Sequence, residues 1–134
     1  MLLKTLGCGG SRAPGHKSPA FLVDGTLLLD AGTISAVLSE SDQAAIRTIL
    51  VTHSHLDHLK GIAHLVDSML LSGNNEPVAV VSTTKILNVL REHIFNFKIW
   101  PDFSLLPSPD DGIIRWVPIE PEHEVHLDGD EVHL

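Results

Sequence analysis

The amino-acid sequence predicts an α+β domain, and two patterns carry that prediction. Short apolar segments bounded by glycine, proline or aspartate recur along the chain, which is typical of strands. Longer segments with apolar residues at helical spacing separate several of them. The chain has 134 residues, 43% of them hydrophobic, which is enough to bury the core of one domain.

A strand is expected first at residues 2–7, which run into a glycine-rich turn. Residues 20–23 and 26–29 should form a hairpin, because Asp24-Gly25 between them suits a tight turn with positive φ. Further strands are expected at 47–51, 77–82, 113–119 and 124–127, followed by a turn and the start of another strand within 128–134.

Helices are expected between these strands. Residues 33–40 carry apolar side chains at helical spacing after Thr33, a candidate N-cap, and a polar turn should follow them. Residues 61–71 would present one apolar face as a helix, and another helix should begin at residue 83 or 84 and end near residue 95. The proline-rich residues 101–112 should form a connecting loop.

The densest group of polar side chains is His53-Ser54-His55-Leu56-Asp57-His58. Imidazole and carboxylate are ligands that zinc prefers, and the absence of Cys from the group indicates a catalytic rather than a structural site. His53 and His55 project to the same side of an extended backbone and can hold one ion. Asp57 and His58 stand where a helix should begin and suit a second ion beside the first. Helix capping by Ser54 or Asp57 is the alternative, but it does not account for three histidines.

The spacing His53-x-His55-x-Asp57-His58 resembles the metal motif of the metallo-β-lactamase fold superfamily. The segment 27–32 is similar to that superfamily's earlier strand, which ends in an aspartate, here Asp30, whose carboxylate supports the metal-binding loop from behind. Within the superfamily, residues 53–62 most resemble the class II cyclic nucleotide phosphodiesterases, and residues 6–11 and 96–101 also resemble bacterial members of that group.

The resemblance implies a metallo-β-lactamase-type fold, a four-layer αββα sandwich made of two similar halves, each with a mixed sheet and flanking helices. Residues 1–134 would then be a single, truncated metallo-β-lactamase-like domain that covers about the first half. In the family, further metal ligands come from later segments: another His, an Asp that bridges both ions, and a last His. We therefore expect the site to be incomplete within this chain.

The resemblance also implies an activity for the full-length parent protein: hydrolysis of a 3′,5′-cyclic nucleotide, cyclic AMP or GMP, by metal-activated water. Two zinc ions are expected, and Mn²⁺ or Fe²⁺ would also suit these ligands. By resemblance, His53 and His55 bind the first metal and Asp57 and His58 the second. Asp57 is also the candidate catalytic residue, which would orient the nucleophile or carry a proton.

Charge and composition restrict the partners. The formal net charge is −8, with only nine Lys and Arg residues, which makes a nucleic-acid partner unlikely on electrostatic grounds but leaves a small phosphodiester substrate open. The sequence contains no apolar run of membrane-spanning length, and Cys8 stands alone, so it forms no internal disulfide. The N-terminus lacks the features of a signal peptide, so a cytoplasmic location is expected.

Other residues have two interpretations each. Arg12, after Gly9-Gly10, could clamp a substrate phosphate, although an ordinary turn explains this segment better. Trp100 and Phe103 could line a nucleobase slot or anchor the core. His16 is expected to be exposed.

Two rival functions stay open. A tRNA 3′-processing endonuclease shares the motif but would need a basic docking surface. Lactamases, lactonases and thioester hydrolases share it too, because the motif identifies the metal centre and not the bond that is cleaved. The rival from another class is a catalytically inactive fragment that lacks the later ligands. Half a sandwich should expose the apolar inner face of its sheet, which favours a homodimer or aggregation.

Overall fold

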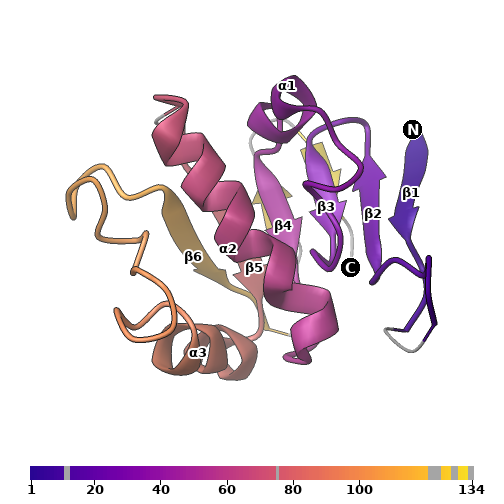
Figure 1. Ribbon diagram of the computed structural model, residues 1–134. Helices are drawn as coiled ribbons and strands as arrows, with labels where there is room; N and C mark the ends of the chain where they lie inside the picture. Colours follow the sequence, from indigo (N-terminus) through magenta and orange to yellow (C-terminus); the bar gives the residue numbers. More distant parts are fainter. Residues whose placement is uncertain (11–12, 75, 121–124, 128–129, 133–134) are drawn as a thin grey trace.

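The computed structural model describes residues 1–10, 13–74, 76–120, 125–127 and 130–132. A six-stranded sheet, ordered β1-β2-β3-β4-β5-β6, forms its centre (Figure 1). The strands are β1 (Leu3–Gly7), β2 (Ala20–Val23), β3 (Leu27–Leu29), β4 (Thr48–Leu50), β5 (Val78–Ser82) and β6 (Ile114–Pro118). A separate two-stranded sheet contains β7 (Val125–Leu127) and β8 (Asp130–Val132).

The large sheet is mixed, as the resemblance to the metallo-β-lactamase fold implies. Strands β1, β2 and β3 pair antiparallel, and β3, β4, β5 and β6 pair parallel. The hairpin turn between β2 and β3 is confirmed by the positive φ angles of 46° at Asp24 and 78° at Gly25. Because β3, β4 and β5 are parallel neighbours, the residues that follow them meet at the same end of the sheet.

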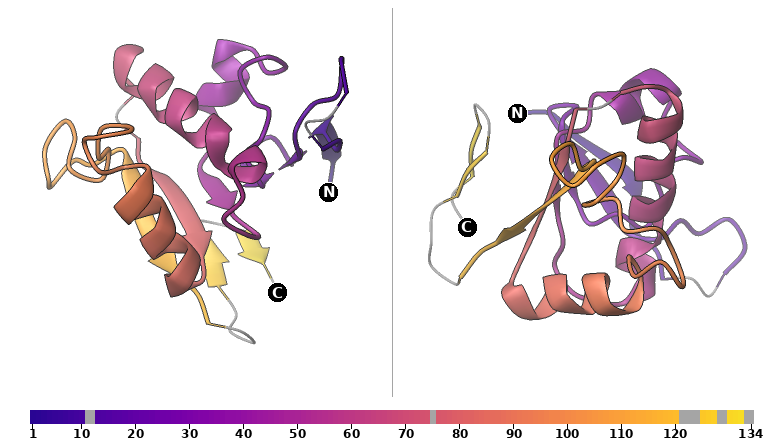
Figure 2. Two further views of the ribbon diagram at one scale, coloured as in Figure 1. Left: turned by 60° about the horizontal axis from the view of Figure 1, so that its bottom comes forward. Right: turned by 90° about the vertical axis from the view of Figure 1, so that its left-hand side faces the viewer.

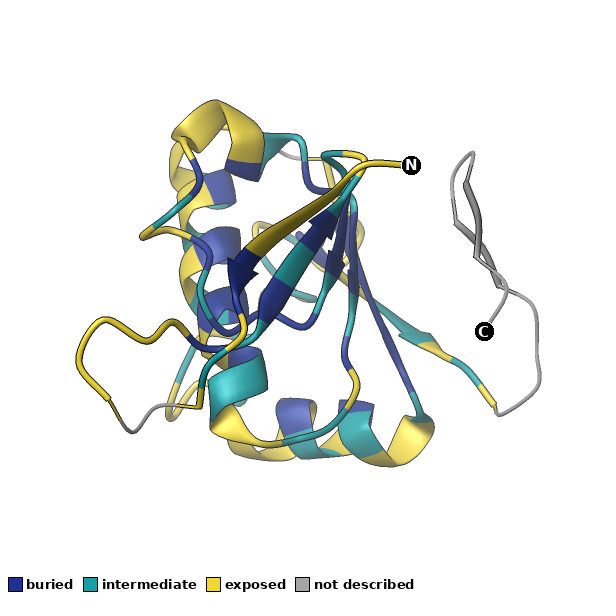
Figure 3. Cartoon of the chain, turned by 90° about the vertical axis from the view of Figure 1, so that its right-hand side faces the viewer, coloured by how far each residue is buried: buried dark blue, intermediate teal, exposed yellow. Residues whose placement is uncertain are grey.

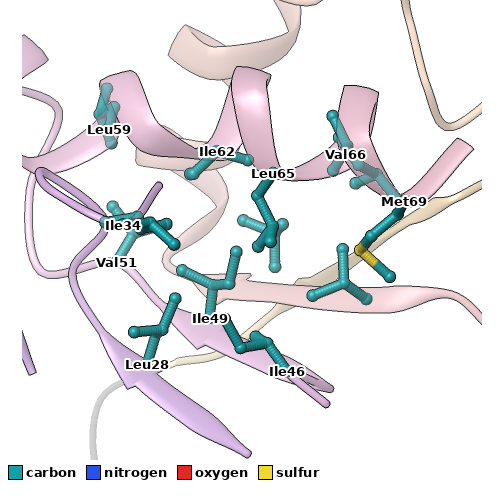
Figure 4. Packing of buried hydrophobic residues seen from close by; sticks show 14 of the residues in the cluster. Leu28, Ile34, Ile46, Ile49, Val51, Leu59, Ile62, Leu65, Val66 and Met69 are labelled. Carbon is teal, nitrogen blue, oxygen red and sulfur yellow. The ribbon is translucent and has the colours of Figure 1, made fainter. Parts of the chain in front are cut away.

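Helix α2 (Leu56–Leu71) crosses one face of the sheet and seals the main core (Figure 4). Its inner side chains Ile62, Leu65 and Val66 are fully buried, and they face Leu28 and Ile49 of the sheet. Each such side chain contributes about 1.5–3 kcal/mol when it leaves water. Helix α3 (Thr84–His93) adds buried leucines to the same core, and Figure 2 shows both helices from two further sides.

The prediction of a helix at residues 33–40 is wrong. The segment is a succession of turns, and the helix begins only at Glu40, as α1 (Glu40–Ala44). Ile34 and Leu38 are buried as predicted, but Ile34 packs beneath α2, close to Gly61. Tertiary packing therefore explains their apolar character. The Ser39 hydroxyl accepts a hydrogen bond from the Asp42 N–H at 3.2 Å and caps α1.

The two edges and the second face of the sheet are less covered. The first residues of β1 are exposed, and Figure 3 shows that burial increases toward the middle strands. On the face away from the main core, Leu27, Ala79 and Val81 form a small buried cluster. Partly buried apolar side chains surround this cluster: Val23, Leu29, Leu50, Val117 and Ile119.

None of the helices in the described residues combines the length and the apolar character needed to cross a membrane.

Candidate metal centre

The histidine-rich segment lies at the end of the sheet where β3, β4 and β5 terminate. Strand β4 ends at Leu50, and the chain then runs through residues 52–55 into α2, whose N-cap is His55. The buried Ser82 hydroxyl at the end of β5 donates a hydrogen bond to the Val51 carbonyl at 2.7 Å. This contact fixes the backbone immediately before the motif.

Asp30 follows β3 and reaches the same place from the neighbouring strand. Its backbone has a φ of 56°, in the left-handed region, which Asp tolerates better than most residues. The Asp30 N–H donates to the Leu50 carbonyl at 2.8 Å, and the Ala31 N–H donates to the His58 carbonyl at 2.8 Å. These bonds join the loop after β3 to both sides of the motif.

Two glycines permit this close approach between the loop and α2. A Cβ atom on Gly32 would collide with the Asp57 carbonyl oxygen, and one on Gly61 would lie 2.6 Å from the Ala31 carbonyl oxygen. Only glycine lacks that atom, so both positions bring backbone against backbone. The Gly61 N–H also donates a hydrogen bond to the Ala31 carbonyl at 2.7 Å.

The Asp30 carboxylate is buried and organises the site. It accepts hydrogen bonds from the Thr52 backbone N–H at 2.9 Å and from the Thr52 hydroxyl, whose oxygen lies 2.8 Å from Oδ2. His58 Nδ1 lies 2.8 Å from the same Oδ2 atom. Because a carboxylate only accepts, Nδ1 of His58 carries a proton, and in the neutral ring Nε2 is left with a free lone pair.

The other side chains of the motif gather around His58. The ring centre of His53 lies 3.8 Å from that of His58 and 4.7 Å from that of His55. Asp57 Oδ2 lies 3.6 Å from His58 Nε2. The structure therefore brings together all four residues proposed as ligands, with Asp30 behind them.

The donor set fits divalent metal ions. Two donors on one tetrahedral zinc ion, each about 2.1 Å from it, lie about 3.4 Å apart. The 3.6 Å between His58 Nε2 and Asp57 Oδ2 is close to that separation. Single donor atoms of Asp30, His53 and His58 also lie within 4.8 Å of one another. Both Asp30 oxygens already accept hydrogen bonds, so this carboxylate is better suited to orienting ligands than to binding an ion itself.

Capping does not account for the motif. The N-cap residue of α2 is His55, and its side chain makes no capping hydrogen bond. Neither Ser54 nor Asp57 takes the cap position, although Asp57 in the first turn interacts favourably with the helix dipole.

The other candidate residues have different outcomes. Arg12 lies outside the described residues. Phe103 is buried in the main core, in agreement with the core interpretation, and the partly buried Trp100 packs edge-on against His64. His16 is exposed. Sequence reasoning missed Thr52, for which the sequence holds no signal beyond its place next to His53.

Comparison with known proteins first defines the class. The crystal structure of unliganded yeast PDE1 superposes with a TM-score of 0.79 at 15% sequence identity, over 93% of this chain and 52% of that one. The fold is that of the metallo-β-lactamase superfamily, of which this chain contains a part.

The family follows from sequence. The model of the class-II cAMP phosphodiesterases matches residues 35–110, and the chain belongs to that family. A 3′,5′-cyclic-nucleotide phosphodiesterase of Schizosaccharomyces pombe is 32% identical over 76 residues, which is 57% of this chain and 20% of the relative. A ribonuclease Z of Aeropyrum pernix is 30% identical over 95 residues, 65% of this chain and 31% of the relative. The chain thus matches only a minor part of these relatives and about half of the solved yeast structure.

Proposed function

We propose that the whole protein containing this chain is a metal-dependent phosphodiesterase that hydrolyses a 3′,5′-cyclic nucleotide to the 5′-nucleotide. The observation that supports it most is the meeting of His53, His55, Asp57 and His58 around one buried carboxylate, in a chain of the class-II family. Residues 1–134 would be the first half of the catalytic domain.

The ligands divide into two pairs in this proposal. His53 and His55 would hold one divalent ion, and Asp57 and His58 would hold the other. Zinc is proposed because imidazole and carboxylate donors suit it, and Mn²⁺ and Fe²⁺ are the alternatives. When bound, such an ion supplies Lewis-acid chemistry: it polarises a phosphoryl oxygen and makes a water molecule more acidic.

The chain's own residues prepare that chemistry. Asp30 keeps the His58 ring in one orientation through the 2.8 Å contact with Nδ1. The Asp57 side chain is 33% exposed, so its carboxylate is accessible to orient an attacking water or take its proton. The net charge of −8 argues for a small substrate, because a long polyanion would be repelled along its whole length.

The test is a comparison of substrates and metals with the complete gene product. Cyclic AMP, cyclic GMP, bis(p-nitrophenyl) phosphate and a β-lactam are offered with and without a chelator. We expect turnover of a cyclic nucleotide, its loss with chelator, and joint loss of activity and bound zinc in His55→Ala. The exposed His93 in α3 supplies the matched control, and His93→Ala should keep both. Turnover that is unaffected by the chelator, or full metal binding by His55→Ala, would contradict the proposal.

A second candidate is a tRNA 3′-processing endonuclease, because the ribonuclease Z of Aeropyrum pernix matches 65% of this chain. A precursor tRNA belongs in the same comparison. Faster cleavage of the precursor tRNA than of any cyclic nucleotide would establish this second candidate in place of the first.

The inactive-fragment alternative concerns the 134-residue chain itself. The cluster of Leu27, Ala79 and Val81 on the second sheet face suits contact with another apolar layer. We expect the isolated chain to lack turnover and to self-associate, which sedimentation would detect as a dimer or larger species. Full activity of a monomeric 134-residue chain would show that catalysis needs no further metal ligands from outside these residues.

A further inference from the structure

We propose that Thr52 is a positioning residue that fixes the tautomer of His53, so that Nε2 of His53 is available to a metal ion. The inference rests on the proposed role of the motif as a metal centre. It is carried by three contacts of one hydroxyl group. The Thr52 Oγ1 atom lies 3.0 Å from Asp30 Oδ1, 2.8 Å from Asp30 Oδ2 and 3.0 Å from His53 Nδ1.

The direction of these contacts follows from counting protons. A threonine hydroxyl has one proton to donate and lone pairs with which to accept. An ionised carboxylate has no proton, so both contacts with Asp30 require the hydroxyl to be the donor. The hydroxyl proton therefore points at Asp30, and only lone pairs remain for His53. His53 Nδ1 must then carry the ring's proton and donate it to Thr52.

The opposite arrangement is disfavoured. If the hydroxyl donated to His53 Nδ1, its lone pairs would face two carboxylate oxygens at 2.8 and 3.0 Å. Oxygen atoms so close, with no proton between them, repel, and the buried Asp30 carboxylate would lose the hydroxyl that donates to it. The ring proton of His53 would also move to Nε2 and block that atom as a metal ligand.

The consequence is that one carboxylate, that of Asp30, fixes the tautomers of two histidine rings. Asp30 accepts directly from His58 Nδ1 at 2.8 Å and reaches His53 Nδ1 through the Thr52 hydroxyl. Both rings are left with an unprotonated Nε2. His55 has no comparable partner among the described residues, so its tautomer is not fixed in advance.

The first test needs no metal and no turnover. Long-range ¹H–¹⁵N NMR of the metal-free chain at about pH 8.5, where imidazole is ordinarily neutral, distinguishes an Nδ1–H ring from an Nε2–H ring. We expect Nδ1–H for His53 in the wild type and in Thr52→Ser, which keeps the hydroxyl. Thr52→Val, which has the same shape without the hydroxyl, should move His53 toward Nε2–H and leave His58 as Nδ1–H.

The second test measures zinc affinity by competition with a chelating dye. Thr52→Val should bind zinc about tenfold more weakly, and Thr52→Ser should regain most of the affinity. Thr5, exposed on the edge strand β1, supplies the control, and Thr5→Val should bind as the wild type does. Thermal unfolding of each metal-free variant verifies that the fold is intact.

The outcomes separate this inference from the proposed function. An Nε2–H ring at His53 in the wild type, or an unchanged ring and unchanged zinc affinity in a folded Thr52→Val, would overturn the role of Thr52 while the metal centre stands. A complete gene product that binds no zinc but shows the expected tautomers would contradict the metal centre, and the contact between Thr52 and His53 would remain.

Discussion

The two ends of the parallel strands use polar side chains in different ways. At the carboxyl end, Asp30, Thr52 and His58 bond to one another and leave ring nitrogens unused. At the amino end, Arg47 Nη1 donates to the Ala44 carbonyl at 2.7 Å, and Asn74 Nδ2 donates to the same carbonyl at 3.2 Å. These donors satisfy the open Ala44 carbonyl at the end of α1, which is a structural role.

Cavity size does not identify the proposed site. A cleft of about 530 Å³ lies at the amino end, between α1 and the last turns of α2, and is lined in part by Gln43 and Met69. Gln43 Oε1 is buried and has no hydrogen-bond partner among the described residues, and its lack of exposure keeps it from a ligand in the cleft. What favours a functional site at the carboxyl end is a set of donor atoms that remain available after the structural bonds are made.

The largest expected effect on zinc affinity comes from Asp30→Asn, which tests the carboxyl end of the parallel strands. Asn is isosteric with Asp, but its amide nitrogen cannot accept, so either Thr52 or His58 loses its acceptor. We expect zinc affinity to fall about 10–100-fold. The free energy of unfolding of the metal-free chain, measured in urea, should fall by about 1–2 kcal/mol. Unchanged zinc affinity would show that Asp30 does not orient the ligands.

Arg47→Met should show the reverse pattern at the amino end. It removes the hydrogen bonds from Nη1 to the carbonyls of Ala44 and Ile46. Urea unfolding should show a loss of about 1–2 kcal/mol because two carbonyls lose a charged donor. Zinc affinity should stay within about twofold of the wild type, since the sites are distant and share no partners. Arg47→Lys is the control that keeps the charge, and a marked fall in zinc affinity in Arg47→Met would remove the distinction between the two ends.

The smallest effect is expected for Gln43→Met. The change gives up the bond from Nε2 to the Leu38 carbonyl at 3.0 Å, but it also removes the buried Oε1 that has no partner. The two contributions oppose each other, so the unfolding free energy should change by less than about 1 kcal/mol in either direction. A loss well above that in urea would mean that Oε1 has a bound water or other partner.

Much of the fold could be predicted because its strands are short apolar runs with clear boundaries. The hairpin around Asp24-Gly25 and the strand before the motif are local features, and local chemistry determines them. The helix expected at residues 33–40 does not form because Ile34 and Leu38 are apolar for a tertiary reason: Ile34 packs against α2, and Leu38 belongs to the main buried core. Ser39 is a visible N-cap signal for a helix that begins at Glu40, but the polar residues after residue 40 are typical of a turn, which is what the sequence predicts there.

The candidate site shows a similar division. His53, His55, Asp57 and His58 could be proposed together because neighbours in sequence cannot be far apart. The partnership of Asp30 with Thr52 spans 22 residues and depends on the register that sets Leu29 beside Leu50 in parallel strands. The resemblance to a known family supplied Asp30, whereas nothing in the sequence indicated the hydroxyl that links it to His53.

The φ angle of 56° at Asp30 narrows the choice of amino acid at that position. A left-handed backbone is adopted readily by glycine, and among the other residues mainly by asparagine and aspartate. Of these three, only aspartate has two oxygens with which to serve Thr52 and His58 at once. The backbone conformation and the hydrogen bonds thus impose two separate requirements on this position, and aspartate is the residue type that meets both.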